Sequence, residues 1–558
     1  MRGSLAVGAL LLLVACGGGG SAPTAAPFSL ALAPGSLRLP PAGKAAATVV
    51  VQGAPGFAGT VDLEGQGLGS DLSGDLQPAR VQVAPGASVQ ALLTLRASDT
   101  ALPAQRVLTL RASAGGGSAT ADLRLDIPAA KVFPVTTFVN QDQTNLTFLA
   151  YQDGDGPWTA VEGQGGVYKL PVTDPAGRFG LVYGSVCSIG AFSSWDVNGF
   201  FETVFDTQAL YVAFLCNPQP GPPPVTFPLG GQLLNTAGLG GLISTNSGLW
   251  SFDPGAPRYD LRLIRGTGDL VAATYPDLST YLPSRFIVER ERDAEAPATR
   301  DLDFGAEGIP APPSLPITAP APGAGESLQG TVQYQTRGGQ TVILANGGAL
   351  SAYVPFPPQA ALAGETTLYG FQASGPGSTR TVVGSFPGAP GPLAPALPSP
   401  IPPFTVPAAG GARLRLGLAW APIQPTPETH QATFTQRAGL EEAYWFVSFS
   451  RRWLGEKGAF TWMPPDLGAV PGFDPRFLFR SGEVVSVSLG QSGQQVPASL
   501  LERLEQGFEL GRGGAGLSGR ARPAGRPGAF SLRRIPAAQA AAAGPESFYA
   551  TRNQSLTP

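Results

Sequence analysis

Residues 120–127 read TADLRLDI, and this stretch decides the fold class of the part of the chain around it. Its apolar residues Leu123, Leu125 and Ile127 occupy every second position, with charged residues between them. Successive side chains of a β-strand point to opposite faces, so this alternation gives one apolar and one polar face. The stretch therefore predicts a strand that lies with one face on a core.

Similar runs recur at short spacing through residues 28–128, for example SVQALLTLRAS (88–98) and RVLTLRAS (106–113). Turn signals such as GAPG and AGGG separate them. About seven strands in roughly 100 residues is typical of a β-sandwich. The segment resembles bacterial immunoglobulin-like modules, notably in PGFAGTVDLEGQGL (55–68). The resemblance implies an immunoglobulin-like β-sandwich over residues 28–128 and indicates almost nothing about function.

The rest of the chain continues in the same style of short strands and turns. QDGDGPW and TDPAGR are turn segments, because Asp bonds its own backbone and Gly accepts positive φ. Proline-rich stretches fix φ and remove donors, which suits connectors. The sequence predicts an all-β protein of tandem β-sandwich modules joined by Pro/Gly-rich linkers. The expected modules and linker cover residues 131–220, 225–308, 309–326 (the Pro-rich linker), 327–430 and 431–513.

Two further resemblances accompany these modules. The order strand, DGDGPW, strand, DPAGRFG, strand is similar to β-rich repeats of uncharacterised bacterial envelope proteins. RYDLRLIRGTGDL (258–270) resembles the small sandwiches called carboxypeptidase-regulatory-like. Both imply β modules and assign no activity.

The C-terminal part carries one helix candidate and one tail of biased composition. Ser499 and Glu502 of SLLERLEQGFEL have the capping-box spacing, which predicts a short helix at the end of the 431–513 module. Residues 514–558 are rich in Gly, Ala, Arg and Pro, a composition that predicts a poorly ordered tail.

The N-terminal residues 1–16, MRGSLAVGALLLLVAC, have the layout of an export signal. The apolar run is about eleven residues long, whereas a membrane-spanning helix needs roughly 20. Leu13, Ala15 and Cys16 resemble the bacterial lipobox, which implies cleavage before Cys16 and a lipid on its sulfur. The alternative is an ordinary secretory signal in which the cysteine is incidental.

A lipid at Cys16 would make the membrane the first expected partner, because two or more acyl chains hold a protein durably. Residues 17–27 are Gly-rich and predict a flexible tether. Gly17, rather than Asp, follows the cysteine, so by analogy the expected membrane is the outer one and not the inner one. The expected location is the cell envelope.

Cys187 and Cys216 remain once Cys16 is assigned to lipid. Both stand in apolar strand-like runs, and an exported protein folds where disulfides form. The sequence favours a disulfide between them, with two buried thiols that never meet as the alternative.

Aromatic residues crowd EEAYWFVSFSRRWLGEKGAFTWMPPDL, where Tyr444, Trp445, Trp453 and Trp462 occur close together. Aromatic side chains presented by a sandwich can stack on sugar rings, which makes these four a candidate ligand platform. Aromatic strand residues are more often core, and that interpretation is the favoured alternative.

Few other residues are candidates for chemistry. The single histidine, His430, has Pro-rich polar flanks that predict a surface turn, and one histidine excludes zinc sites with two histidine ligands. Asp153 and Asp155 could share a calcium ion, although Asp-Gly pairs commonly form hairpin turns. No cofactor is expected.

Composition narrows the function classes. Lys and Arg number 36 against 39 Asp and Glu, with no basic stripe, so nucleic acid is not an expected partner. We expect a non-catalytic envelope protein with an adhesion, scaffolding or glycan-contacting role, whose partners are envelope glycans or proteins. A carbohydrate-active hydrolase using paired carboxylates and a solute-binding lipoprotein are the alternatives.

Overall fold

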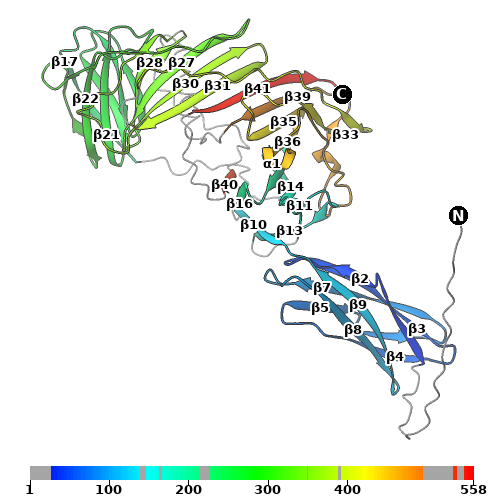
Figure 1. Cartoon of the computed structure of the whole chain (residues 1–558). Helices are drawn as coiled ribbons and strands as arrows, with labels where there is room; N and C mark the ends of the chain where they lie inside the picture. The colour runs from blue at the N-terminus through cyan, green and yellow to red at the C-terminus, as the bar shows by residue number, and fades with distance from the viewer. Residues whose placement is uncertain are drawn as a thin grey trace. The chain divides into compact units, whose positions relative to one another are not determined.

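The computed structural model describes residues 27–138, 146–161, 166–189, 191–213, 225–348, 350–387, 391–493, 532–536 and 546–558. The chain divides into two compact units, Met1–Val132 and Phe133–Pro558. Both units are built from strands, which confirms the predicted all-β fold class (Figure 1). Among the described residues, no helix has the length and apolar character needed to cross a membrane.

Unit 1 is a sandwich of two sheets around one core. The first sheet has the order β1 (Phe28–Ala33), β3 (Lys44–Gly53), β7 (Ser88–Ala97), β5 (Leu72–Gln77). The second has the order β2 (Ser36–Arg38), β9 (Gly117–Ile127), β8 (Ala104–Ala114), β4 (Gly59–Gln66), β6 (Arg80–Val83).

The alternation of β9 is realised as the sequence predicts. Leu123, Leu125 and Ile127 are buried in the unit 1 core, and the charged residues between them are exposed. Apolar burial contributes about 25 cal/mol per Å², so the side chains at every second position hold the two sheets together.

Unit 2 is dominated by a twelve-stranded sheet. Its order is β12 (Thr159–Ala160), β11 (Leu146–Asp153), β14 (Arg178–Ile189), β15 (Phe192–Thr203), β36 (Glu441–Ser450), β35 (Thr429–Ala438), β39 (Val485–Ser492), β41 (Glu546–Leu556), β31 (Ser378–Pro387), β30 (Thr366–Gly375), β27 (Ser327–Gln335), β28 (Thr341–Gly347).

This sheet joins segments that are far apart in the sequence. β15 pairs in parallel with β36, with Trp195 opposite Ala443 and Phe201 opposite Phe449. β41 lies between β39 and β31 and pairs antiparallel with both, as the red strand of Figure 1 shows. The predicted disorder of residues 514–558 is therefore wrong for 546–556, because both edges of that strand are hydrogen-bonded.

The predicted module boundaries after residue 130 are also crossed. Strands from the expected modules 131–220, 327–430 and 431–513 share the twelve-stranded sheet. The expected linker 309–326 contributes β25 (Ile309–Pro310) and β26 (Leu315–Pro316), which pair with β22 (Arg285–Ala294) and β29 (Ala352–Tyr353) respectively. The predicted helix at 499–510 lies outside the described residues.

Smaller sheets complete unit 2. Their orders are β13 (Val167–Val172), β10 (Lys131–Phe138), β16 (Thr207–Ala213), β40 (Leu532–Pro536); β20 (Arg258–Ile264), β17 (Thr226–Leu234), β23 (Ala298–Thr299), with β24 (Leu302–Asp303) also on β17; and β19 (Gly248–Phe252), β18 (Gly240–Thr245), β21 (Gly266–Tyr275), β22 (Arg285–Ala294), β25.

Short elements occupy the remaining positions. They are the pair β26–β29 (Ala352–Tyr353), the sheet β32 (Ala408–Gly410), β33 (Arg413–Leu416), β38 (Phe479–Arg480), the pair β34 (Leu418–Trp420), β37 (Phe460–Trp462), the helix α1 (Arg451–Leu454) and the 3-10 helix η1 (Pro475–Phe477). β33, β34, β37 and η1 contribute to the largest apolar cluster of unit 2, together with one face of β15, β36 and β35.

Candidate functional site

The aromatic residues proposed as a ligand platform lie mainly in the core of unit 2. Trp445, on β36, is 1% exposed, and its Nε1 donates a hydrogen bond to the Phe477 carbonyl oxygen at 2.6 Å. Trp462, on β37, is also buried. A buried ring has no free face for a sugar.

Trp453 and Tyr444 do not restore the platform. Trp453, on α1, is partly buried, with its ring 4.9 Å from that of Phe201 and 5.8 Å from that of Phe449. Tyr444 is half-buried and lies on the opposite face of β36 from Trp445. The platform interpretation is therefore wrong, and the core alternative describes Trp445, Trp453 and Trp462.

His430 lies in β35, not in a surface turn, so that expectation is wrong. The side chain is 2% exposed, and the Trp420 Nε1 donates to its Nδ1 at 3.0 Å. Burial lowers the pKa of His430 to about 4, so the ring is neutral near pH 7. Its Nδ1 accepts a hydrogen bond, which assigns the ring proton to Nε2. The residue stabilises an aromatic core.

Asp153 and Asp155 lie at a turn and have separate protein partners. Asp153 accepts from the backbone N–H groups of Thr173 and Asp174 at 2.9 and 3.0 Å. Asp155 pairs with the Arg178 guanidinium at 2.8 Å. The described residues contain no group of three or more His, Cys, Asp or Glu placed to hold a metal ion. The turn is confirmed, and the calcium site stays a prediction.

The cysteine predictions concern positions of which only one is described. Cys187 is buried in β14. Cys216 and the lipidation residue Cys16 lie outside the described residues. The disulfide and the lipid anchor therefore stay predictions.

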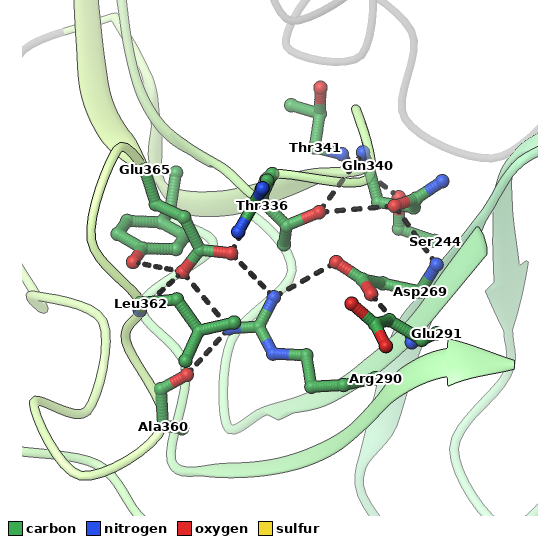
Figure 2. Close-up of polar contacts among 12 residues, drawn as sticks. Ser244, Asp269, Arg290, Glu291, Thr336, Gln340, Thr341, Ala360, Leu362 and Glu365 are labelled. Carbon is green, nitrogen blue, oxygen red and sulfur yellow. Dashed lines mark hydrogen bonds and ion pairs between the residues drawn. The ribbon is translucent and has the colours of Figure 1, made fainter.

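A buried ionic cluster, which the sequence did not predict, links two sheets of unit 2 (Figure 2). Arg290, on β22, donates to Asp269 on β21 at 2.9 Å and to both oxygens of Glu365 at 2.6 and 3.0 Å. Glu365 immediately precedes β30, and its side chain is 0% exposed. Arg290 thus connects the five-stranded sheet to the end of the twelve-stranded one.

Every carboxylate of this cluster is ionised and satisfied. Burial raises the pKa of Glu365, but hydrogen bonds from Tyr334, the backbone of Arg337 and Leu362, and Arg290 outweigh it and lower that pKa. Burial also raises the pKa of Asp269. Hydrogen bonds from Thr336, the backbone of Glu291 and Arg290 outweigh this effect, so the pKa of Asp269 is lowered as well. Carboxylates held in this way act as structural links and are poor proton donors or bases near pH 7.

Asp196, on β15, is the contrasting acid of unit 2. It is 4% exposed and accepts a hydrogen bond from the Ser194 hydroxyl at 2.6 Å. Burial raises its pKa to about 7, the Ser194 hydrogen bond opposes this rise, and the charge of Glu442 adds to it. A folded-state pKa raised in this way lowers the stability of the protein at neutral pH. Neither Asp196 nor its burial was predicted from the sequence.

No protein-family model matches the sequence, and no curated protein matches it. Among solved structures, the chain is similar to the Bacillus anthracis TIE protein (8% identity, 66% of this chain, 74% of that chain, TM-score 0.14). It is similar to domains 4–9 of the surface layer protein SbsC (9%, 82%, 79%, TM-score 0.14). It is also similar to the Pseudomonas aeruginosa CupB2 chaperone (12%, 30%, 98%, TM-score 0.14). Superpositions at these TM-scores carry no functional argument.

Proposed function

We propose that this protein is a lipid-anchored component of the bacterial cell envelope with a non-catalytic adhesion or scaffolding role. The observation that supports the role is the twelve-stranded sheet, which gathers strands between residues 146 and 556 into one body. A sheet continuous over so many strands transmits load through its backbone hydrogen bonds, and a rigid body of this kind suits a scaffold.

The ionised side chains of unit 2 support the same role. Arg290, Asp269 and Glu365 bind one another, and Glu326 and Arg380 form another buried ion pair. The first group joins two sheets, and the second joins two parts of the twelve-stranded sheet. A hydrolase of sugars instead needs two carboxylates about 5 to 9.5 Å apart that flank a substrate. The all-β fold also differs from the two α/β lobes that a solute-binding lipoprotein would need.

The anchor is tested by the variant Cys16→Ser in cells fractionated into soluble and membrane pools. The parent is expected to pellet with membranes and to incorporate labelled palmitate, because Cys16 would carry the lipid. The variant is expected to lose the label and to leave the membrane fraction. Ser21→Ala, in the proposed tether, is the matched control and is expected to behave as the parent. Continued membrane sedimentation of Cys16→Ser would contradict the lipid anchor.

The scaffolding role is tested separately, with the full-length Cys16→Ser chain as bait for solubilised envelope fractions. We expect envelope proteins or glycans to be retained, and a bait unfolded by urea to retain none of them specifically. Retention of no envelope component by the folded chain would overturn the role and leave the anchor unaffected.

A further inference from the structure

Three arginines of unit 2 lie together near one end of β15. Arg413, on β33, stands directly opposite Arg480, on β38, in an antiparallel pair. Arg476, in η1, lies with its guanidinium carbon 4.0 Å from the centre of the Trp195 ring. We refer to Arg413, Arg476 and Arg480 as the arginine cluster.

The cluster carries more positive charge than its carboxylates neutralise. Arg476 pairs with Asp474 at 2.7 Å, and Arg480 pairs with Glu441. Arg413 donates to the Leu478 carbonyl oxygen at 3.1 Å and has no ion pair among the described residues. The five charged groups therefore sum to one net positive charge.

This arrangement costs stability in the unliganded protein. Like charges placed directly opposite each other on paired strands repel. Burial lowers the pKa of Arg413, and the charges of Arg480 and Arg476 lower it further. The charges of Glu441 and Asp474 oppose this shift in part. A repulsive pair in a short three-stranded sheet needs a compensating role, and a bound anion would supply it.

Two further residues near the cluster carry hydrogen-bond donors. Trp195 is 8% exposed, and its buried Nε1 has no hydrogen-bond acceptor in the part of the chain that the structure describes. Arg415, two residues after Arg413 and on the same face of β33, donates to the Pro464 carbonyl oxygen at 3.3 Å and forms no ion pair within the described residues. Trp195 therefore adds a donor without an acceptor, and Arg415 adds a further positive charge beside the arginine cluster.

The cluster is accessible to solvent. The side chains of Arg476 and Arg480 are 50% and 39% exposed. A guanidinium presents a planar fork of donors that matches the oxygens of carboxylate and phosphate. The rings of Trp195 and Phe477 pack edge to face at 5.3 Å, and Arg476 covers Trp195, so stacking on a sugar ring is not available here.

We propose that the arginine cluster is a binding site for an oxyanion, a carboxylate or a phosphate group, with Arg413 as its principal contact. This proposal does not depend on the lipid anchor or on the scaffolding role.

The test is calorimetric titration of the full-length Cys16→Ser chain, at constant ionic strength in chloride, with two probes. Inorganic phosphate tests the phosphate source, and trigalacturonate tests the carboxylate source. We expect saturable binding of at least one probe. Arg413→Gln is expected to weaken it about tenfold or more, because a hydrogen bond to a charged group is lost. Arg258→Gln, an exposed arginine on β20, removes the same charge and is expected to leave binding unchanged.

A stability measurement separates binding from folding. In phosphate-free buffer, Arg413→Gln is expected to unfold at the same temperature as the parent or higher, because the repulsion with Arg480 is relieved. Arg476→Gln, at a half-exposed position, is a second variant expected to fold and to bind more weakly. Failure of both probes to bind the parent, or undiminished binding by both variants, would overturn the site.

Discussion

Unit 1 and unit 2 are both built from strands, but they collect those strands over different sequence distances. In unit 1, β8 and β9 form a hairpin that closes from Ala114 to Gly117. In unit 2, β15 pairs with β36, and β41 closes the gap between β39 and β31. One chain therefore combines a module whose strands all pair within residues 28–127 with a body in which strands as distant as β15 and β36 pair.

The largest expected effect comes from deleting residues 546–558, which removes β41. The edges of β39 and β31 would lose their partner strand, and the sheet would be left in two parts. We expect the calorimetric transition of unit 2 to disappear or to fall steeply in temperature. The transition of unit 1 is expected to stay where it is, because its core contains no residue of β41. Two unchanged transitions would show that the sheet does not depend on β41.

The next largest effect is expected from Glu365→Ala in the ionic cluster. Removal of one partner from a buried ion pair typically costs about 3–5 kcal/mol. Here Arg290 keeps Asp269, but the Tyr334 hydroxyl and the backbone N–H groups of Arg337 and Leu362 lose their acceptor. We expect a loss of this size in the unfolding free energy of unit 2, measured in urea. Glu295→Ala breaks an exposed pair with Arg265 and is the control, with an expected loss of at most about 1 kcal/mol. Equal losses would mean that the cluster does not link the sheets.

In unit 1, the corresponding test compares Leu123→Ala with Leu92→Ala. Leu123 is fully buried in the core, and a core Leu→Ala change costs about 2–5 kcal/mol. Leu92 is half exposed on the outer face of β7, and its replacement is expected to stay within about 0.5 kcal/mol. Urea unfolding of the unit 1 transition measures both. A large loss at Leu92 would indicate that this face is covered.

The smallest expected effect is a gain, from Asp196→Asn. The folded-state pKa of Asp196 is raised to about 7 from the ordinary 3.8, so the folded state binds this proton more tightly than the unfolded state does. Ionisation of Asp196 therefore lowers the free energy of unfolding progressively as the pH rises from about 4 to 7. Above pH 7 the free energy of unfolding falls no further from this cause. We expect Asp196→Asn to stabilise unit 2 at pH 8 by about 1–3 kcal/mol and to change little at pH 4. A gain that does not depend on pH would contradict the raised pKa.

Strands with one buried face can be predicted from the sequence, whereas the pairing of distant strands cannot. Strands with one buried face, such as β9, alternate visibly and were predicted. β15 is buried on both faces from Trp195 to Thr203, so its sequence, WDVNGFFET, shows no apolar alternation. Its partner β36 is distant in the sequence, and no local pattern indicates which strands will pair.

The candidate sites were harder to predict for related reasons. His430 has proline-rich flanks, yet its strand runs through the centre of the sheet. Arg413 and Arg480 become neighbours only through the pairing of β33 with β38. An arginine looks the same in the sequence whether its partner is water, a carboxylate or a second arginine.

The position of β41 has a consequence for the order in which the two units can fold. All strands of unit 1 lie within residues 28–127, so unit 1 can fold before the rest of the chain has reached the same compartment. The large sheet needs residues 546–556, and until these pair, β39 and β31 expose unpaired backbone edges that invite association with other chains. Those edges need protection until β41 is in place.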